Sequence, residues 1–74
     1  MLKLGIYRNW KNGKYYRVFH IAQHTETEEW FVIYQEDGDK GQFWARPLEM
    51  FCEKLQINGT IVPRFTYIGE TREK

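Results

Sequence analysis

Few side chains in this 74-residue sequence have the chemistry of a catalytic site. The sequence has no serine, which excludes a serine nucleophile, and Cys52 is its single cysteine. A cysteine beside a histidine can act as a nucleophile. Cys52, however, follows Pro47 in an apolar run, where a lone cysteine is usually a small buried hydrophobic residue. We therefore expect no catalytic residue and a protein that is not an enzyme.

The two histidines, His20 and His24, are four residues apart. On a helix this spacing would place both on one face, but on the strand expected here four residues span about 13 Å, too far for one metal ion. A metal hypothesis remains only for His24 with Glu26 or Glu28 in a polar loop. We favour a structural role in which His24 hydrogen-bonds the turn, and we expect no metal and no cofactor.

Charge is distributed unevenly along the chain, although the formal net charge is only +1. Residues 1–24 carry five basic and no acidic side chains, whereas residues 25–39 carry six acidic and no basic ones. The basic segment is rich in tyrosine, and aromatic rings beside Lys or Arg are typical of single-stranded nucleic-acid sites. The residues of this hypothesis are Arg8, Lys11, Lys14, Tyr15 and Arg17. The same charges could instead form a solvated strand face or offset the acidic loops by Coulomb attraction.

Aromatic residues near the acidic loops suggest a different ligand. Small barrels that bind peptides lay exposed rings along a groove beside an acidic loop, which holds a basic residue of the ligand. A groove is expected from Tyr7, Tyr34, Trp44, Pro47 and Tyr67, and the ligand-binding residues that we select are Tyr7, His24, Glu26, Tyr34, Trp44, Arg46 and Pro47. The alternative is that these rings fill the core, since a small barrel needs most of its large rings inside.

The segment Trp44-Ala45-Arg46-Pro47 supports two interpretations. If Ala45 points into the barrel, Trp44 and Arg46 share the outer face, where a guanidinium can stack on the indole and bind a carboxylate or phosphate. The simpler interpretation, which we favour, is an internal ion pair of Arg46 with Glu49 or Glu26.

Short strands separated by turn signals must position these residues. Strands are expected over 6–11, 14–23, 30–34, 42–46, 55–57, 60–62 and 65–68. Asn12-Gly13 and Asn58-Gly59 each predict a hairpin with a two-residue type I′ turn, and Pro63 limits its strand to an edge position. Pro47 and Glu49 favour a helical turn within 47–53. The pattern predicts an all-β fold, a small SH3-like barrel of about five strands with one short helical turn after the fourth. A small open α+β sheet is the alternative.

Length and composition limit the function further. A chain of 74 residues is too short for a TIM barrel or a dinucleotide-binding enzyme with a substrate domain. One cysteine excludes a disulfide framework and suggests a reducing compartment, so we expect a cytoplasmic protein. No apolar run is long enough to span a membrane. We expect one domain over 1–69, a disordered tail over 70–74, no membrane partner, and a monomer or weak homodimer.

The sequence also resembles a family of small bacterial proteins known only as a domain of unknown function. Two motifs carry the resemblance: Ala-x-His-Ser/Thr-Glu-Thr, here 22–27, and Trp-x-Arg-Pro-x-x-Met-Phe, here 44–51. Tyr7, Lys11, Gly13, Tyr16, the Val-x-Tyr of 32–34 and the Val-Pro-Arg-Phe of 62–65 also match. The resemblance implies a small cytoplasmic bacterial or phage protein with a barrel-like fold, and it implies no activity. The sequence thus predicts a non-catalytic binding module for a peptide or protein, with single-stranded nucleic acid or RNA as the alternative ligand.

Overall fold

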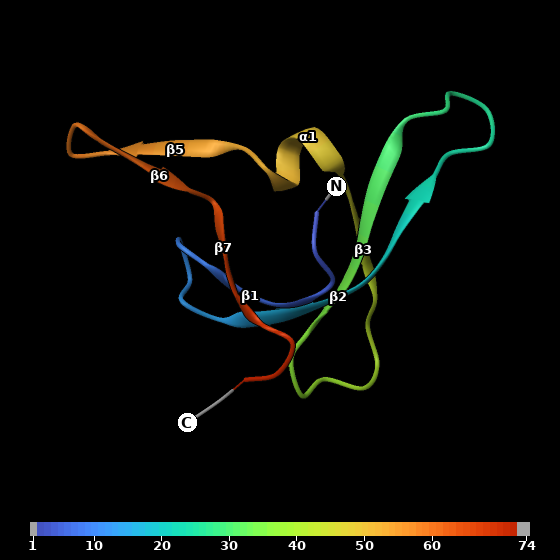
Figure 1. Ribbon diagram of the computed structural model, residues 1–74, viewed down its shortest axis with the longest axis horizontal. Coiled ribbons are helices and arrows are strands. Elements are labelled where there is room, and N and C mark those ends of the chain that lie inside the picture. Colours follow the sequence, from blue (N-terminus) through green and yellow to red (C-terminus); the bar gives the residue numbers. More distant parts are fainter. Residues whose placement is uncertain (1, 73–74) are drawn as a thin grey trace.

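Seven strands and one short helix make up the protein, whose computed structural model describes residues 2–72 (Figure 1). In chain order they are β1 (Gly5–Asn9), β2 (Tyr15–Gln23), β3 (Trp30–Glu36), β4 (Trp44–Pro47), α1 (Leu48–Phe51), β5 (Lys54–Ile57), β6 (Thr60–Pro63) and β7 (Phe65–Gly69). The predicted all-β class, with one helical turn after the fourth strand, is confirmed. In the described residues, no helix is long and apolar enough to cross a membrane.

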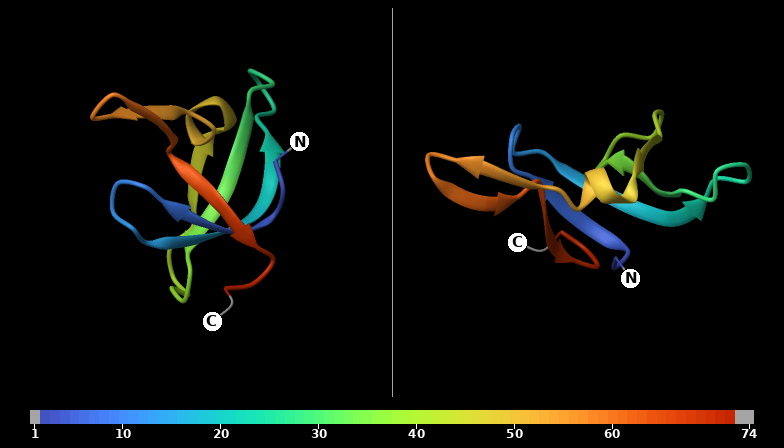
Figure 2. Two further views of the ribbon diagram at one scale, coloured as in Figure 1. Left: turned by 60° about the vertical axis from the view of Figure 1, so that its left-hand side comes forward. Right: turned by 90° about the horizontal axis from the view of Figure 1, so that it is seen from above.

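Five strands form one antiparallel sheet in the order β4-β3-β2-β1-β7, and β5 and β6 form a separate hairpin. The segment from α1 to β6 therefore connects the two edge strands of the sheet (Figure 2). The pairing of β2 with β3 shifts register between Val18 and His20. A bulge of this kind increases local twist and bends a strand, which explains how the nine-residue β2 carries apolar side chains on both parities.

Aromatic rings dominate the core on one side of the sheet. Phe51, the buried residue of α1, lies flat against Phe65 of β7, with ring centroids 4.1 Å apart and planes 3° apart. The edges of Tyr7 and Tyr34 meet the Phe51 ring at centroid distances of 5.3 Å and 5.6 Å. Val18 and Val32 complete the buried cluster. The single helical turn therefore joins three separate strands through one ring.

The two Asn-Gly pairs behave differently. Asn58 and Gly59 have φ of 50° and 81°, and they form the predicted two-residue turn of the β5–β6 hairpin. At the first pair only Gly13 has positive φ, 73°, and β1 ends at Asn9 instead of Lys11. The Asn9 side-chain oxygen accepts hydrogen bonds from the backbone N–H groups of Lys11 (2.8 Å) and Asn12 (3.1 Å). The type I′ prediction is wrong here because this side chain stabilises a longer loop.

The C-terminal residues expected to be disordered are placed against the sheet as far as Arg72. The Arg72 guanidinium lies 4.1 Å from the ring centroid of Tyr15, and its Nη1 lies 3.7 Å from a carboxylate oxygen of Asp37. The Arg17 guanidinium donates to the backbone oxygen of Glu70 at 3.3 Å. Residues 73–74 of the expected tail lie outside the described residues.

Candidate functional site

Two of the rings selected from the sequence are part of the core. Tyr7 and Tyr34 are only 4% and 6% exposed. The Tyr7 hydroxyl donates to the backbone oxygen of Lys3 at 2.7 Å. Burial, with a smaller contribution from the neighbouring Tyr67, raises the pKa of Tyr7 to about 12. Tyr7 therefore belongs to the interior and does not line an open groove.

The β4 strand places Trp44 and Arg46 on the core-facing side of the sheet. In its register with β3, Trp44 lies opposite Tyr34 and Arg46 opposite Val32, and opposite residues of an antiparallel pair share a face. Ala45 lies opposite Ile33 on the other side. The interpretation that Ala45 points inward is therefore wrong, because the buried positions of β3 fix the opposite parity for β4. Trp44 stays 51% exposed because it lies on an edge strand.

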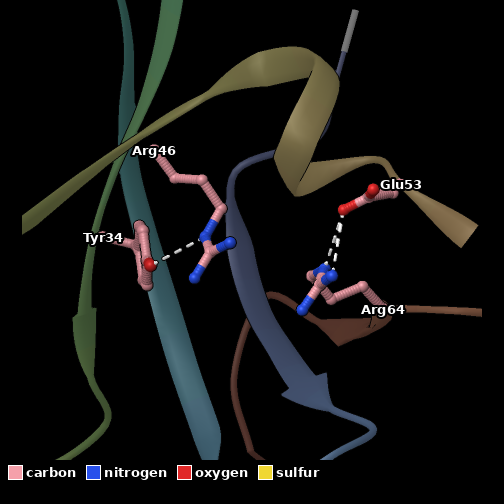
Figure 3. Close-up of polar contacts among 4 residues, drawn as sticks. All are labelled: Tyr34, Arg46, Glu53 and Arg64. Carbon is pink, nitrogen blue, oxygen red and sulfur yellow. Dashed lines mark hydrogen bonds and ion pairs between the residues drawn. The ribbon is translucent and has the colours of Figure 1, made fainter. Parts of the chain in front are cut away.

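Arg46 is partly buried and contacts two aromatic side chains. Its Nε donates to the Tyr34 hydroxyl at 3.2 Å (Figure 3), and its guanidinium carbon lies 5.8 Å from the ring centroid of Phe65. The ion pair expected with Glu49 or Glu26 is not formed, since no carboxylate in residues 2–72 lies within 4.0 Å of Arg46. The side chain extends towards Tyr34, whereas Glu26 lies in the loop beyond β2.

The other arginines show what a paired guanidinium looks like in this fold. Arg64 bonds a single carboxylate oxygen of Glu53 through Nη2 (2.9 Å) and Nε (3.3 Å) (Figure 3). Arg17 and Arg72 both lie within 4.0 Å of Asp37. Of the arginines that the structure describes, only Arg8 and Arg46 have no carboxylate within 4.0 Å. A guanidinium has five N–H donors, so Arg46 can bind a carboxylate or phosphate with those that Tyr34 does not take.

His24, Glu26 and Pro47 do not join this cluster. The Nδ1 of His24 accepts hydrogen bonds from the backbone N–H groups of Glu26 (3.0 Å) and Thr27 (3.2 Å), which confirms the expected structural role of His24. Glu26 is exposed in this loop, and Pro47 is half-buried at the end of β4. Residues 2–72 contain no group of three or more His, Cys, Asp or Glu side chains that could hold a metal ion.

The expectation that Cys52 is buried is wrong. Cys52 is exposed, not buried in an apolar run. The physical reason is the length of α1, which ends after one turn with Cys52 as its C-cap and buries only Phe51. The Cys52 backbone N–H closes this turn by donating to the Leu48 oxygen at 3.0 Å.

Acidic side chains lie close to some of the basic side chains of the first hairpin. Lys14 lies 3.9 Å from a carboxylate oxygen of Glu36, and Arg17 lies 4.0 Å from Asp37. These contacts support the interpretation that some basic side chains offset the acidic loops. Arg8 instead lies over the Tyr15 ring at 5.8 Å. Of the predicted nucleic-acid residues, Arg8 and Lys11 are thus exposed with no carboxylate within 4.0 Å among the described residues.

Two exposed tryptophans are not among the site residues predicted from the sequence. Trp10 and Trp30 are 52% and 39% exposed, and each lines a cleft. Trp30 is the first residue of the strand expected over 30–34, and in the structure it begins β3 next to the loop. Trp10 follows Arg8 by two residues, a spacing that places both side chains on one face of a strand. This spacing, next to the turn signal Asn12-Gly13, could have identified Trp10 as a surface residue beside Arg8.

Comparisons with known proteins extend over almost the whole chain. A sequence model of the family described as "Protein of unknown function (DUF1653)" matches residues 5–67. The chain is similar to a crystal structure of a protein of this family from Bordetella bronchiseptica, with a TM-score of 0.83 and 27% sequence identity. The similarity covers 99% of this chain and 95% of that one. No curated protein matches the chain.

Proposed function

We propose that this chain, which belongs to the DUF1653 family of proteins of unknown function, is a non-catalytic module that binds a peptide or protein segment carrying an acidic group. The observation that carries this proposal is the partly buried guanidinium of Arg46, with no carboxylate within 4.0 Å among the described residues. A charge that has lost part of its hydration without gaining a counter-ion is unfavourable. A ligand carboxylate would supply that counter-ion.

Trp44 and Arg46 provide the two parts of the proposed binding surface. They are two residues apart on one face of an edge strand, and the indole is half-exposed. A guanidinium binds a carboxylate through parallel hydrogen bonds with defined geometry. Trp and Arg are the residue types that most often dominate binding energy at protein interfaces. We propose that Arg46 holds the ligand carboxylate and that Trp44 packs against a neighbouring apolar side chain of the ligand.

The charges near Trp44 favour an acidic ligand over the basic one expected from the sequence. The loop that precedes β4 contains Asp37 and Asp39, and both are occupied. Asp37 lies within 4.0 Å of two arginines, and Asp39 accepts a hydrogen bond from the backbone N–H of Gly41 at 2.9 Å. Arg46, two residues from Trp44, has no carboxylate within 4.0 Å among the described residues, so attraction for an anion prevails at this surface.

Three finer assignments accompany the proposal. The five-stranded antiparallel sheet, the bulge in the pairing of β2 with β3 and the short helix after β4 support a relationship to SH3-like barrels. The exposed, single cysteine suits a reducing compartment, which supports a cytoplasmic location. The similarity to a Bordetella bronchiseptica protein supports a bacterial origin.

Amide-shift mapping by NMR tests the proposal with three eight-residue peptides of matched length. The first contains three Glu and one Leu, the second replaces each Glu by Gln, and the third replaces each Glu by Lys. We expect the Glu peptide alone to shift the Trp44 indole and Arg46 Nε–H signals. Arg46→Gln should remove this binding, whereas the control Arg64→Gln, on the arginine already paired with Glu53, should retain it. Binding of the Lys peptide, or equal binding by Arg46→Gln, would overturn the proposal.

A further inference from the structure

The cleft beside Trp10 lies on the side of the sheet opposite the core. It has a volume of about 380 Å³ and is lined by Arg8, Asn9, Trp10, Thr66 and Ile68. This volume falls within the range of about 300–1,000 Å³ typical of small-molecule sites. Arg8 of β1 faces Thr66 of β7 in the strand register, one position after the buried Tyr7. Because side chains alternate along a strand, Arg8 and Thr66 point away from the core.

Hydrogen bonds hold the cleft in shape. The Trp10 backbone N–H donates to the Arg64 oxygen at 2.8 Å, which fixes this loop residue beside the start of β7. The preceding residue, Asn9, is 8% exposed, and its side-chain oxygen accepts two backbone hydrogen bonds from the loop. Trp10 therefore projects from an ordered turn, on the same cleft as a strand residue, Ile68.

The lining combines flat apolar surface with an available cation. Trp10 and Ile68 are 52% and 43% exposed. The Arg8 Nε makes one long hydrogen bond, to the Gly13 oxygen at 3.3 Å, and no carboxylate in residues 2–72 lies within 4.0 Å of Arg8. An indole stacks on any base because every base has a π-face, and a guanidinium matches the geometry of a phosphate.

We infer that this cleft binds one nucleotide unit, with the base stacked on Trp10 beside Ile68 and the phosphate at Arg8. The inference is independent of the proposed peptide site, since it uses the opposite face and none of the same residues. We expect a longer nucleic-acid strand to contact the protein through only a few nucleotides. Of the other basic residues of the first hairpin, Lys14 and Arg17 already face carboxylates, and Lys11 remains exposed on the loop.

NMR titration of the full chain with 5′-AMP and with an eight-nucleotide oligo-dT tests the inference. We expect either probe to shift the Trp10 indole N–H signal, assigned with Trp10→Phe, together with amides of residues 8–10 and 66–68. Trp10→Ala and Arg8→Gln should each weaken binding at least tenfold, while Trp10→Phe retains it. Lys40→Gln, on an exposed basic residue that does not line the cleft, serves as the control and should bind normally.

The two probes distinguish the source of the nucleotide. Binding of AMP alone indicates a free nucleotide, and binding of the oligonucleotide alone or of both indicates a strand; either result supports the site. For the strand, raising salt from 50 to 200 mM should weaken binding about 2.6-fold for each phosphate contacted, and Arg8→Gln should remove one such factor. Absence of shifts with both probes at millimolar concentration overturns the inference. Shifts that inorganic phosphate reproduces without moving the Trp10 indole, or that persist in Trp10→Ala, also overturn it.

Discussion

Replacing Phe51 by alanine tests the role of the short helix most severely. The Phe51 ring is 1% exposed and contacts the rings of Phe65, Tyr7 and Tyr34. Truncating a buried Phe to Ala costs about 3–5 kcal/mol. The upper part of this range is expected because the stacked pair contributes about 0.5–1.5 kcal/mol beyond its buried area. The surrounding rings also come from three strands that cannot all move into the cavity.

Urea unfolding followed by circular dichroism measures this loss. At about 0.05–0.15 kcal/mol per residue, the whole chain is stable by about 4–11 kcal/mol, so Phe51→Ala removes a large fraction. If that variant is already unfolded in water, Phe51→Leu provides a milder loss. Met50→Ala is the matched control, since Met50 is the adjacent helix residue and is 47% exposed. A loss below about 1 kcal/mol for Phe51→Ala, or equal losses for both alanine variants, would refute the packing argument.

Three further predictions concern backbone geometry and pH. Gly5 has φ of +133°, and an added Cβ would lie 2.6 Å from the Gly69 oxygen. Gly5→Ala should therefore destabilise the folded protein by more than the control Gly38→Ala, whose added Cβ meets nothing within 4 Å. Equal unfolding midpoints of the two variants in urea would contradict this. Asn58→Ala should cost about 1–2 kcal/mol because Ala strains at positive φ, while Asn58→Gly should cost less in thermal unfolding, and no difference between the two would count against the turn. Burial raises the pKa of Tyr7 from 10.0 to about 12, so the folded state favours the neutral form of the Tyr7 hydroxyl. The contribution of Tyr7 to stability should therefore be fully present below pH 10 and be lost between pH 10 and 12. Tyr7→Phe should flatten this loss of stability. If the stability of Tyr7→Phe depends on pH as that of wild type does, Tyr7 is not the cause of the loss.

Local sequence signals predicted the strands but not every turn. Trp30 begins β3 as expected, because aromatic and β-branched residues follow one another there. Asn58-Gly59 forms its predicted turn, whereas Asn12-Gly13 does not, because Asn9 binds the N–H groups of the first loop. An asparagine three residues before an Asn-Gly pair is a local signal, and it could be used to separate the two cases.

The candidate site depended on information that the sequence does not hold locally. Residues 42–46 have apolar side chains on both parities, so only pairing with Val32 and Tyr34 of β3 decides that Trp44 and Arg46 face the core side. Ion-pair partners are equally non-local, since Arg17 meets Asp37 while Arg46 meets a tyrosine hydroxyl. Residue types thus identified Arg46 as a candidate, and the register determined what surrounds it.

Thermal unfolding of the wild-type chain and of Arg46→Gln, each with and without the Glu peptide, tests the central claim most directly. If Arg46 holds a ligand and not the fold, the variant alone should be within about 1 kcal/mol of wild type, or about 4–8 °C in Tm. Added peptide should raise the Tm of wild type, because it binds only the folded state, and leave the Tm of Arg46→Gln unchanged. A variant several kcal/mol less stable without peptide, or the same rise in both proteins, would contradict the claim.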